Sequence, residues 1–485
     1  MDSEKHMIVT HKRPQASDLL YIYLVENFAT EATHHGVSNG VEVLFIESDK
    51  DLKDKDGNSL VPFIETMDES EVSFCGRGGG MYDEHGKNIL DCEATLLGKK
   101  LGLLWEVSPR LRDASARQAD EKVWPNQSFE ISDRNGTRKK KFAVRDPKMR
   151  DLFAVVARDD IGGSQPYSLG NMIDLMHYRY PDDPEKIMRW AFSLFRAICA
   201  YGPFPKEERK EQCRITVNCL LYALDCVGRF EGVEKEYHKN AREHLREWLT
   251  KRADGEYWQP LDLIDISALM LNRWGSDLYD WPLEVVTAEV ERQHEFHIVS
   301  AEEAKNADLI DVQILVKEGG SERIESRKIA VINSDDLDVH KYLSAADLGY
   351  YAICVIKQNS RGQVQIFPGN FAKEVKRGDK VRINQLSYNF PMQYVAAAVR
   401  EAECKARGIR VPSWLELVSD RGPISEQTWF YYSRTGWLMN GSLTMPDVEP
   451  TKLSIGDIAE IVRIGFDVEC KGYREAHMEQ LKLRM

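Results

Sequence analysis

Short apolar runs alternate with helical patterns in the first 100 residues of the chain. Strands are predicted for three runs of apolar and β-branched residues, at 7–10, 41–46 and 72–75. Apolar residues at helical spacing predict a helix over 18–28, with Ser17 as its N-cap, and a second helix over 92–100. Strands separated by helices are typical of an α/β fold, and we expect a doubly wound, mostly parallel sheet.

The pattern changes twice in the rest of the chain. Asn135-Gly136 predicts a hairpin turn, and mostly helical periodicity follows. Strand signals return after residue 300, with a hairpin around 359–362 and two helices near the C-terminus, over 392–406 and 454–464. The pattern indicates no internal repeat. We expect three domains: a sheet domain over 1–165, a mainly helical connector over 166–300 and a C-terminal α+β domain over 301–485.

Composition narrows the class of protein. The chain has 485 residues, of which 42% are hydrophobic and 29% charged, and this balance excludes wholesale disorder. No apolar run reaches the roughly 18 residues that a membrane span needs. Nine cysteines without a Cys-x-x-Cys pair predict reduced thiols and a cytoplasmic protein. The net charge of −13 repels polyanions, so nucleic-acid binding requires a local basic patch.

Acids and histidines cluster in three segments, each expected at the carboxyl end of a strand, where α/β sheets bind ligands. The candidates are His11, Asp18, Asp83, Glu84, His85 and Asp159. Mixed carboxylate and imidazole ligands suit Mn²⁺ or Mg²⁺, and such ions can activate water and clamp a phosphodiester. Each candidate also has a structural explanation: a hydrogen-bonding histidine, an acid at a helix start, or a turn. The order and spacing of the three segments favour the site.

These three segments resemble a known family. The segments are Thr10–Asp18, Tyr82–Gly86 and Arg158–Asp160, and they are similar to the motifs of the DHH phosphoesterase superfamily. The most similar branch is the melanocyte-proliferating-gene-type exonucleases, which open with Thr-His-(x)4-His-x-Asp. Weaker similarity continues at 180–185, 363–367 and 436–442. The resemblance implies a metal-dependent phosphoesterase fold, with Mn²⁺ (or Mg²⁺) as the ion and short nucleic acids or nucleotides as substrates.

The motifs depart from the family pattern at three places. Ala16 stands where the family has a second histidine, and Gly76 or Arg77 stands where it has an aspartate. Glu84 occupies the middle of the Asp-His-His signature. Five candidate ligands remain: His11, Asp18, Asp83, His85 and Asp159. These five ligands favour a site for one ion, or a site that binds no ion, over a site for two ions. Glu84 and His85 are the predicted catalytic residues, with Glu84 as a ligand or as the general base.

Two surfaces outside this site are candidates for binding. Arg138, Lys139, Lys140 and Lys141 form the densest basic run, which either follows a phosphate backbone or is a solvated hairpin. The aromatic run 429–432 either stacks bases, covers a partner or forms a buried strand. The acids at 335–338 with His340 either bind a cation or form the loop before a helix.

These patterns support three functional hypotheses. The first is a metal-dependent phosphodiesterase or exonuclease that acts on single-stranded nucleic acid or a small nucleotide through metal-activated water. The second is a catalytically degenerate scaffold that kept the fold and binds nucleic acid, a nucleotide or a protein partner, as a homo-oligomer or within a larger complex. The third is an unrelated α/β protein whose motifs arose by chance. No membrane association is expected.

Overall fold

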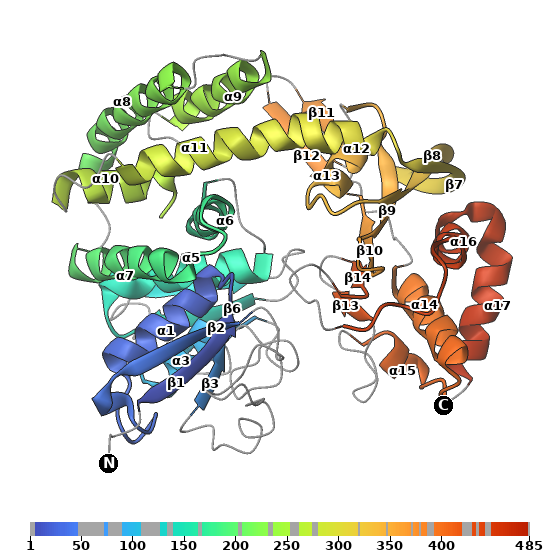
Figure 1. Cartoon of the computed structure of the whole chain (residues 1–485), viewed down its shortest axis with the longest axis horizontal. Coiled ribbons are helices and arrows are strands. Elements are labelled where there is room, and N and C mark those ends of the chain that lie inside the picture. Colours follow the sequence, from blue (N-terminus) through green and yellow to red (C-terminus); the bar gives the residue numbers. More distant parts are fainter. Residues whose placement is uncertain are drawn as a thin grey trace. The chain divides into compact units, whose positions relative to one another are not determined.

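The computed structural model divides the chain into two compact units, Met1–His294 (unit 1) and Glu295–Met485 (unit 2) (Figure 1). It describes residues 5–46, 72–75, 90–107, 127–132, 139–162, 167–201, 206–230, 236–252, 261–273, 280–318, 321–345, 348–369, 372–377, 380–385, 392–419, 429–432, 436–441 and 448–483. In unit 1, residues before and after position 165 contribute to one hydrophobic core.

A three-stranded parallel sheet forms the first layer of unit 1. Its order is β2-β1-β3, with strands β1 (His6–His11), β2 (Val41–Ile46) and β3 (Val72–Cys75). Thr10 of β1 lies in register with Cys75, the last residue of β3. The predictions of these strands and of an α/β fold are confirmed, whereas the DHH-like arrangement stays a prediction.

Helix α1 (Ala16–Phe28) packs against this sheet and is buried along ten consecutive residues, 16–25. Its N-cap is Gln15, so the predicted N-cap at Ser17 is wrong. The Asp18 carboxylate accepts the main-chain N–H of Gln15 at 2.7 Å and closes the first turn. Ser17 donates its hydroxyl to Asp160 at 3.0 Å instead. The predicted second helix is confirmed as α3 (Glu93–Lys100), with Cys92 as its N-cap.

A second sheet in unit 1 is antiparallel, with the order β4-β6-β5. Its strands are β4 (Leu104–Glu106), β5 (Ser128–Ser132) and β6 (Lys139–Val144). The pairing of β5 with β6 confirms the predicted hairpin, while its turn at 135–136 lies outside the described residues. The expectation of a mostly parallel sheet therefore holds for β1–β3 alone in this unit.

The segment around Asp159 is a helix, which corrects the strand end expected there. Helix α5 (Arg150–Gly162) follows the short helix η3 (Pro147–Met149). Its buried residues Leu152, Val155 and Val156 recur three to four positions apart, which is helical and not strand periodicity. Asp159 therefore lies on a helix rather than at the carboxyl edge of the sheet.

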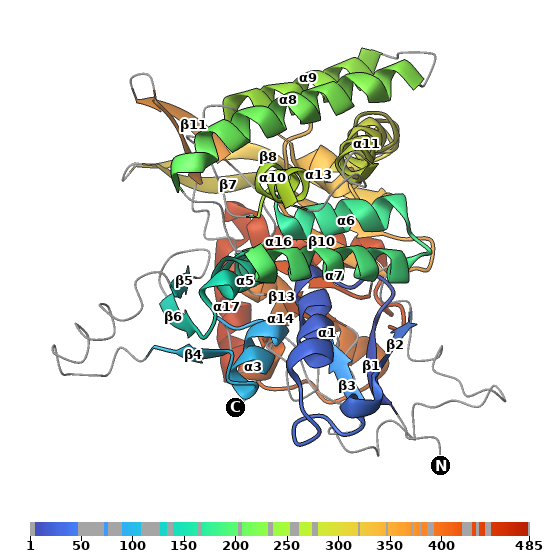
Figure 2. The same cartoon turned by 90° about the vertical axis from the view of Figure 1, so that its left-hand side faces the viewer.

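Helices make up the rest of unit 1, as predicted for 166–300 (Figure 2). They are α6 (Leu169–Arg179), α7 (Pro184–Tyr201), α8 (Lys206–Phe230), α9 (Glu236–Arg252), α10 (Leu263–Arg273) and α11 (Asp280–Glu295); η1 (Val37–Asn39) lies earlier. Helices α8 and α9 pack side by side.

A local repeat links α6 to α10, although the sequence pattern indicated none. Tyr167 (φ 61°) and Leu261 (φ 56°) each adopt the left-handed backbone conformation. Each lies two residues before the start of its helix. Ser168 and Asp262, the next residues, form an isolated antiparallel bridge. The main-chain N–H of Tyr167 and of Leu261 donates to a side chain four residues ahead, Asn171 and Asp265 respectively. The printed sequence shows Gln-Pro-x-[Ser/Asp]-Leu at 165–169 and at 259–263.

Unit 2 contains a six-stranded sheet of order β13-β14-β10-β9-β8-β7. Its strands are β7 (Asp308–Glu318), β8 (Ser321–Asn333), β9 (Ala352–Gln358), β10 (Val364–Pro368), β13 (Phe430–Tyr432) and β14 (Trp437–Met439). β8 and β9 pair in parallel and the other neighbours antiparallel. A separate antiparallel pair consists of β11 (Ala372–Arg377) and β12 (Lys380–Gln385). The predicted hairpin of β9 and β10 is confirmed.

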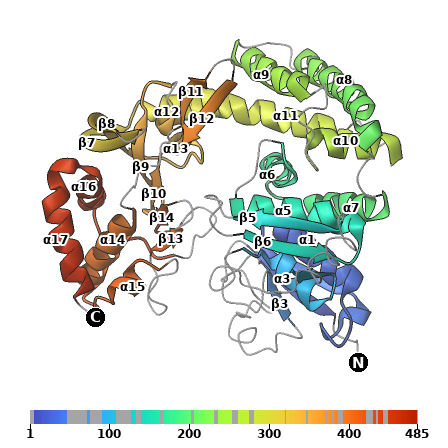
Figure 3. The same cartoon turned by 180° about the vertical axis from the view of Figure 1, so that it is seen from behind.

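Helices pack on both faces of this sheet (Figure 3). Helices α14 (Met392–Arg407) and α16 (Ile455–Phe466) cover one face, and α12 (Ala301–Ala304) and α13 (Val339–Ser344) cover the other. The unit also contains η5 (Phe296–Ser300), α15 (Trp414–Leu417), η7 (Val468–Cys470) and α17 (Lys471–Lys482). The two predicted C-terminal helices are confirmed as α14 and α16, including the capping box of Ser454 with Asp457. Among the described residues, no helix is both long and apolar enough to cross a membrane.

Candidate functional site

Three buried side chains meet at the carboxyl edge of the parallel sheet in unit 1. Asp18 lies in the first turn of α1, Cys75 ends β3, and Glu93 begins α3. Each offers one ligand atom, and these three atoms all lie within 4.8 Å of one another. The residues are 3%, 0% and 4% exposed, respectively. This Asp18–Cys75–Glu93 cluster has the residue types and the spacing of a metal site.

Two helix starts and one strand end place the cluster. The Asp18 carboxylate uses Oδ2 to cap the main chain at Gln15, which leaves Oδ1 facing Cys75 Sγ at 3.7 Å. Glu93 directly follows Cys92, the N-cap of α3. The amino-terminal end of a helix carries positive partial charge, so both helix starts stabilise a carboxylate at these positions. The local fold therefore offsets part of the cost of burying two acids together.

The thiol of Cys75 is held in its protonated form by its surroundings. Burial, and then the charges of Glu93 and Asp18, raise the pKa of this thiol well above its usual value. The thiol donates weakly to Asp18, at 3.5 Å to its main-chain oxygen and at 3.7 Å to Oδ1. Two carboxylates this close favour either a shared proton or a bound cation, since like charges in a buried site destabilise each other. A metal ion would replace the thiol proton here.

A buried hydroxyl group lies beside the cluster. Thr10 pairs in register with Cys75, and residues in register on neighbouring strands direct their side chains to the same face of a sheet. Thr10 is 0% exposed, and its Oγ1 has no hydrogen-bond partner within the described part of the chain. An unsatisfied buried hydroxyl costs about 1–3 kcal/mol. A ligand bound at the cluster would offer it a partner.

The donor set fits a divalent metal, with a preference among ions. Carboxylate oxygens bind Mg²⁺, Mn²⁺ and Zn²⁺, whereas a thiolate favours softer ions such as Zn²⁺. The Mn²⁺ (or Mg²⁺) expected from the family resemblance would find two suitable oxygen donors in Asp18 and Glu93. The sulfur of Cys75 makes zinc the better match for all three.

The structure brings together part of the predicted site. Asp18 belongs to the cluster, and His11, half-buried at the end of β1, directly follows Thr10. Asp159 has a different local role on α5: it accepts hydrogen bonds from Ser168 Oγ at 2.7 Å and Gly170 N at 3.0 Å, at the start of α6. The remaining predicted ligands and catalytic residues lie outside the described residues: Asp83, Glu84 and His85.

Sequence reasoning missed Cys75 and Glu93. Both carried a readable signal, because Cys75 ends a predicted strand and Glu93 is the second residue of the helix predicted over 92–100. The rule that selected Asp18, an acid in the first turn after a strand, applies equally to Glu93. A cysteine at a strand end was read as part of the apolar run and not as a ligand.

The predicted nucleic-acid-binding lysines lie on β6, and two of them, Lys139 and Lys140, contact acids of their own unit. Lys139 pairs with Glu130 at 2.8 Å on the neighbouring strand. Lys140, whose side chain is 17% exposed, contacts Asp91 at 2.5 Å and Glu106 at 3.1 Å. Burial alone would lower the pKa of Lys140, but these two acids outweigh it and raise the pKa. Lys141 is half-buried, and Arg138 lies outside the described residues.

In unit 2, the structure decides between the alternatives for two segments. The aromatic run contributes Phe430–Tyr432 to strand β13, and Trp429 and Tyr431 are buried, which matches the buried-strand reading. The acids at 335–338 form the loop before α13: Asp335 accepts Ser360 N at 2.8 Å and Asp336 accepts Asp338 N at 2.9 Å. These contacts match the loop reading.

No family model, curated protein or solved structure matches the chain. The functional assignment therefore depends on the chemistry of the Asp18–Cys75–Glu93 cluster and on the three sequence segments.

Proposed function

We propose that the protein is a metal-dependent phosphoesterase that hydrolyses phosphodiester bonds in single-stranded nucleic acid or a small nucleotide. The observation that carries this proposal is the buried Asp18–Cys75–Glu93 cluster, whose ligand atoms lie within 4.8 Å of one another at the carboxyl edge of a parallel sheet. That edge is where α/β sheets bind their ligands. The cluster supports one ion rather than two.

A divalent ion at this position supplies a water of lowered pKa and a positive charge for a phosphoryl oxygen. The residues of the chain would hold the ion and orient the group bound to it. Asp18 and Glu93 balance the charge, and their helix starts hold the carboxylates in place. The Thr10 hydroxyl, on the same face as Cys75, would hydrogen-bond to a ligand bound at the cluster. His11 and His85 stay candidate ligands, and Glu84 and His85 stay the candidate catalytic residues, with Glu84 as a ligand or as the general base.

The substrate class rests on the resemblance of the three segments to DHH phosphoesterases. Lys141 and Arg138 remain candidates for contacting the substrate backbone. Lys139 and Lys140 contribute less positive charge to such a path because Glu130, Asp91 and Glu106 neutralise them.

A hydrolysis assay tests the proposal. Purified full-length protein is incubated with bis(p-nitrophenyl) phosphate and with end-labelled single-stranded RNA and DNA, with Zn²⁺ or Mn²⁺ added. Asp18→Asn removes one ligand charge, and Glu26→Gln, an exposed position on the same helix, serves as the matched control. We expect metal-dependent cleavage by the wild type and Glu26→Gln, and a loss of at least about 100-fold in Asp18→Asn, equivalent to about 2.7 kcal/mol of transition-state stabilisation. Equal activity of the two variants would reject the cluster as the active site.

A second candidate is a non-catalytic scaffold that binds a nucleotide, nucleic acid or protein partner. The observation that favours it is the structural use of predicted site residues: Asp159 binds the start of α6, and Lys140 is neutralised by Asp91 and Glu106. No cleavage under any metal condition by folded wild-type protein would support this function instead.

A further inference from the structure

We infer that the ion held by the cluster belongs to the zinc class, with the Cys75 sulfur as a thiolate ligand and the Thr10 hydroxyl as the partner of a metal-bound oxygen. This inference rests on the proposed function, because it concerns the same site. It specifies the class of metal that the site selects, and it assigns that selectivity to Cys75 and Thr10.

The spacing within the cluster fits zinc coordination. Tetrahedral zinc with a sulfur at about 2.3 Å and an oxygen at about 2.1 Å places these two ligand atoms about 3.6 Å apart. Cys75 Sγ and Asp18 Oδ1 lie 3.7 Å apart. An octahedral Mg²⁺ site, with oxygens at about 2.1 Å, places neighbouring oxygens about 3.0 Å apart. The Cys75–Asp18 distance is close to the tetrahedral value for a sulfur and an oxygen, whereas the octahedral value applies to pairs of oxygens.

The position of Cys75 places its sulfur within reach of any ion that both acids bind. Its main chain is paired with β1 opposite Thr10, and its side chain is completely buried among the two acids. An ion that contacts both Asp18 and Glu93 therefore lies within reach of the sulfur. Thiolates bind zinc strongly, whereas Mg²⁺ and Mn²⁺ prefer sites made of oxygen and nitrogen donors.

Thr10 is an independent observation that points to a ligand. Its hydroxyl belongs neither to the acidic pair nor to the thiol, yet it is fully buried, lies on the same face as Cys75, and has no partner among the described residues. A zinc site with three protein ligands keeps a fourth position for water or substrate. A water there would accept or donate a hydrogen bond at Thr10 Oγ1, which would satisfy the hydroxyl.

Cobalt spectroscopy of the full-length protein tests the inference. Co²⁺ replaces Zn²⁺ in tetrahedral sites, and a cobalt–thiolate bond gives a near-ultraviolet charge-transfer band that carboxylate ligands lack. We expect the band in wild type and Glu26→Gln, its loss in Cys75→Ser, and its removal by one equivalent of Zn²⁺ but not by an equal amount of Mn²⁺. Thr10→Val should keep the band and weaken zinc binding by roughly 10-fold or more.

The outcomes separate this inference from the proposed function. Mn²⁺-dependent cleavage without a thiolate band overturns the zinc inference and leaves the phosphoesterase in place. A thiolate band that needs Cys75, together with no cleavage, upholds the inference and overturns the phosphoesterase. No metal bound by wild type overturns both. If Cys75→Ser fails to fold, a wild-type spectrum without the thiolate band still overturns the inference.

Discussion

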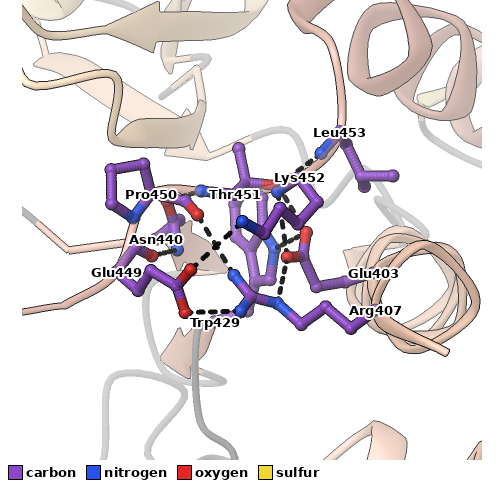
Figure 4. A network of polar contacts seen from close by, with 9 residues as sticks. All are labelled: Glu403, Arg407, Trp429, Asn440, Glu449, Pro450, Thr451, Lys452 and Leu453. Carbon is purple, nitrogen blue, oxygen red and sulfur yellow. Dashed lines mark hydrogen bonds and ion pairs between the residues drawn. The ribbon is translucent and has the colours of Figure 1, made fainter. Parts of the chain in front are cut away.

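A buried carboxylate in unit 2 allows a stability prediction with a magnitude. Glu403 of α14 is 3% exposed and accepts hydrogen bonds from four groups (Figure 4). The donors are Arg407 Nε at 2.6 Å, Lys452 N at 3.0 Å, Trp429 Nε1 at 3.2 Å and the Thr451 hydroxyl. The carboxylate thus joins α14 to the start of β13 and to the segment before α16.

The charge of Glu403 is part of this network. Burial alone would raise the pKa of Glu403, but the hydrogen bonds from Thr451, Lys452, Arg407 and Trp429 outweigh it, and the pKa is lowered. Because the pKa in the folded state lies below the unfolded value, the carboxylate contributes stability above the unfolded pKa. This contribution is lost as the pH falls through the folded pKa.

Glu403→Gln keeps the shape of the side chain, removes its charge and replaces one acceptor oxygen by a donor. Hydrogen bonds to a charged group contribute about 1.5–3 kcal/mol each, and breaking a buried ion pair costs about 3–5 kcal/mol. Arg407 keeps a second partner in Glu449, so we place the loss at the lower end, about 3 kcal/mol. Urea unfolding of the full-length protein at pH 7, followed by circular dichroism, measures it.

Glu449→Gln is the matched control, because Glu449 also pairs with Arg407, at 2.6 Å, but its side chain is 57% exposed. Water and salt screen this second pair, so we expect a much smaller change in the urea midpoint. The difference between wild type and Glu403→Gln should also shrink at acidic pH. Equal midpoint changes for the two variants, or a Glu403→Gln midpoint equal to wild type, would refute the reasoning.

Two further predictions concern unit 1. Gly98→Ala should destabilise the protein by roughly 1–3 kcal/mol, since the new Cβ would lie 2.7 Å from Leu104 Cδ2. Gly472→Ala is the control: its Cβ would have no atom within 4 Å, so we expect a neutral or slightly stabilising effect in the same urea titration. Burial lowers the pKa of His177 to about 4, so the unfolded chain binds the extra proton between pH 6.5 and 4 and stability falls as the pH drops. We expect wild type to lose about 2 kcal/mol more than His177→Gln between pH 7 and pH 5, and equal losses would contradict this.

Local patterns were sufficient to predict most elements near the site. The strand runs 41–46 and 72–75 match β2 and β3, because both runs are short and contain the β-branched and aromatic residues that favour strands. The segment around Asp159 was misjudged because a short apolar run suits a buried helix as well as a strand. Its helical spacing becomes evident when Leu152 is counted with Val155 and Val156.

The site itself was less accessible to sequence reasoning. Asp18 was found because acids at helix starts after strands are informative, whereas Cys75 and Glu93 became ligand candidates once strand register and the start of α3 were known. Contacts between distant segments, such as Thr10 beside Cys75 or Lys140 with Asp91, depend on tertiary packing, which no local pattern encodes. The local repeat of Tyr167 and Leu261 was hidden by its short length.

The central claim is that Asp18, Cys75 and Glu93 bind a metal ion, and anomalous diffraction tests it most directly. Crystals of protein prepared with one equivalent of Zn²⁺ are measured on both sides of the zinc absorption edge. The account predicts one anomalous peak at the cluster, about 2.3 Å from Cys75 Sγ and about 2.0–2.2 Å from a carboxylate oxygen of each acid. A cluster without a peak, with Cys75 hydrogen-bonded to Asp18 in its place, would contradict it.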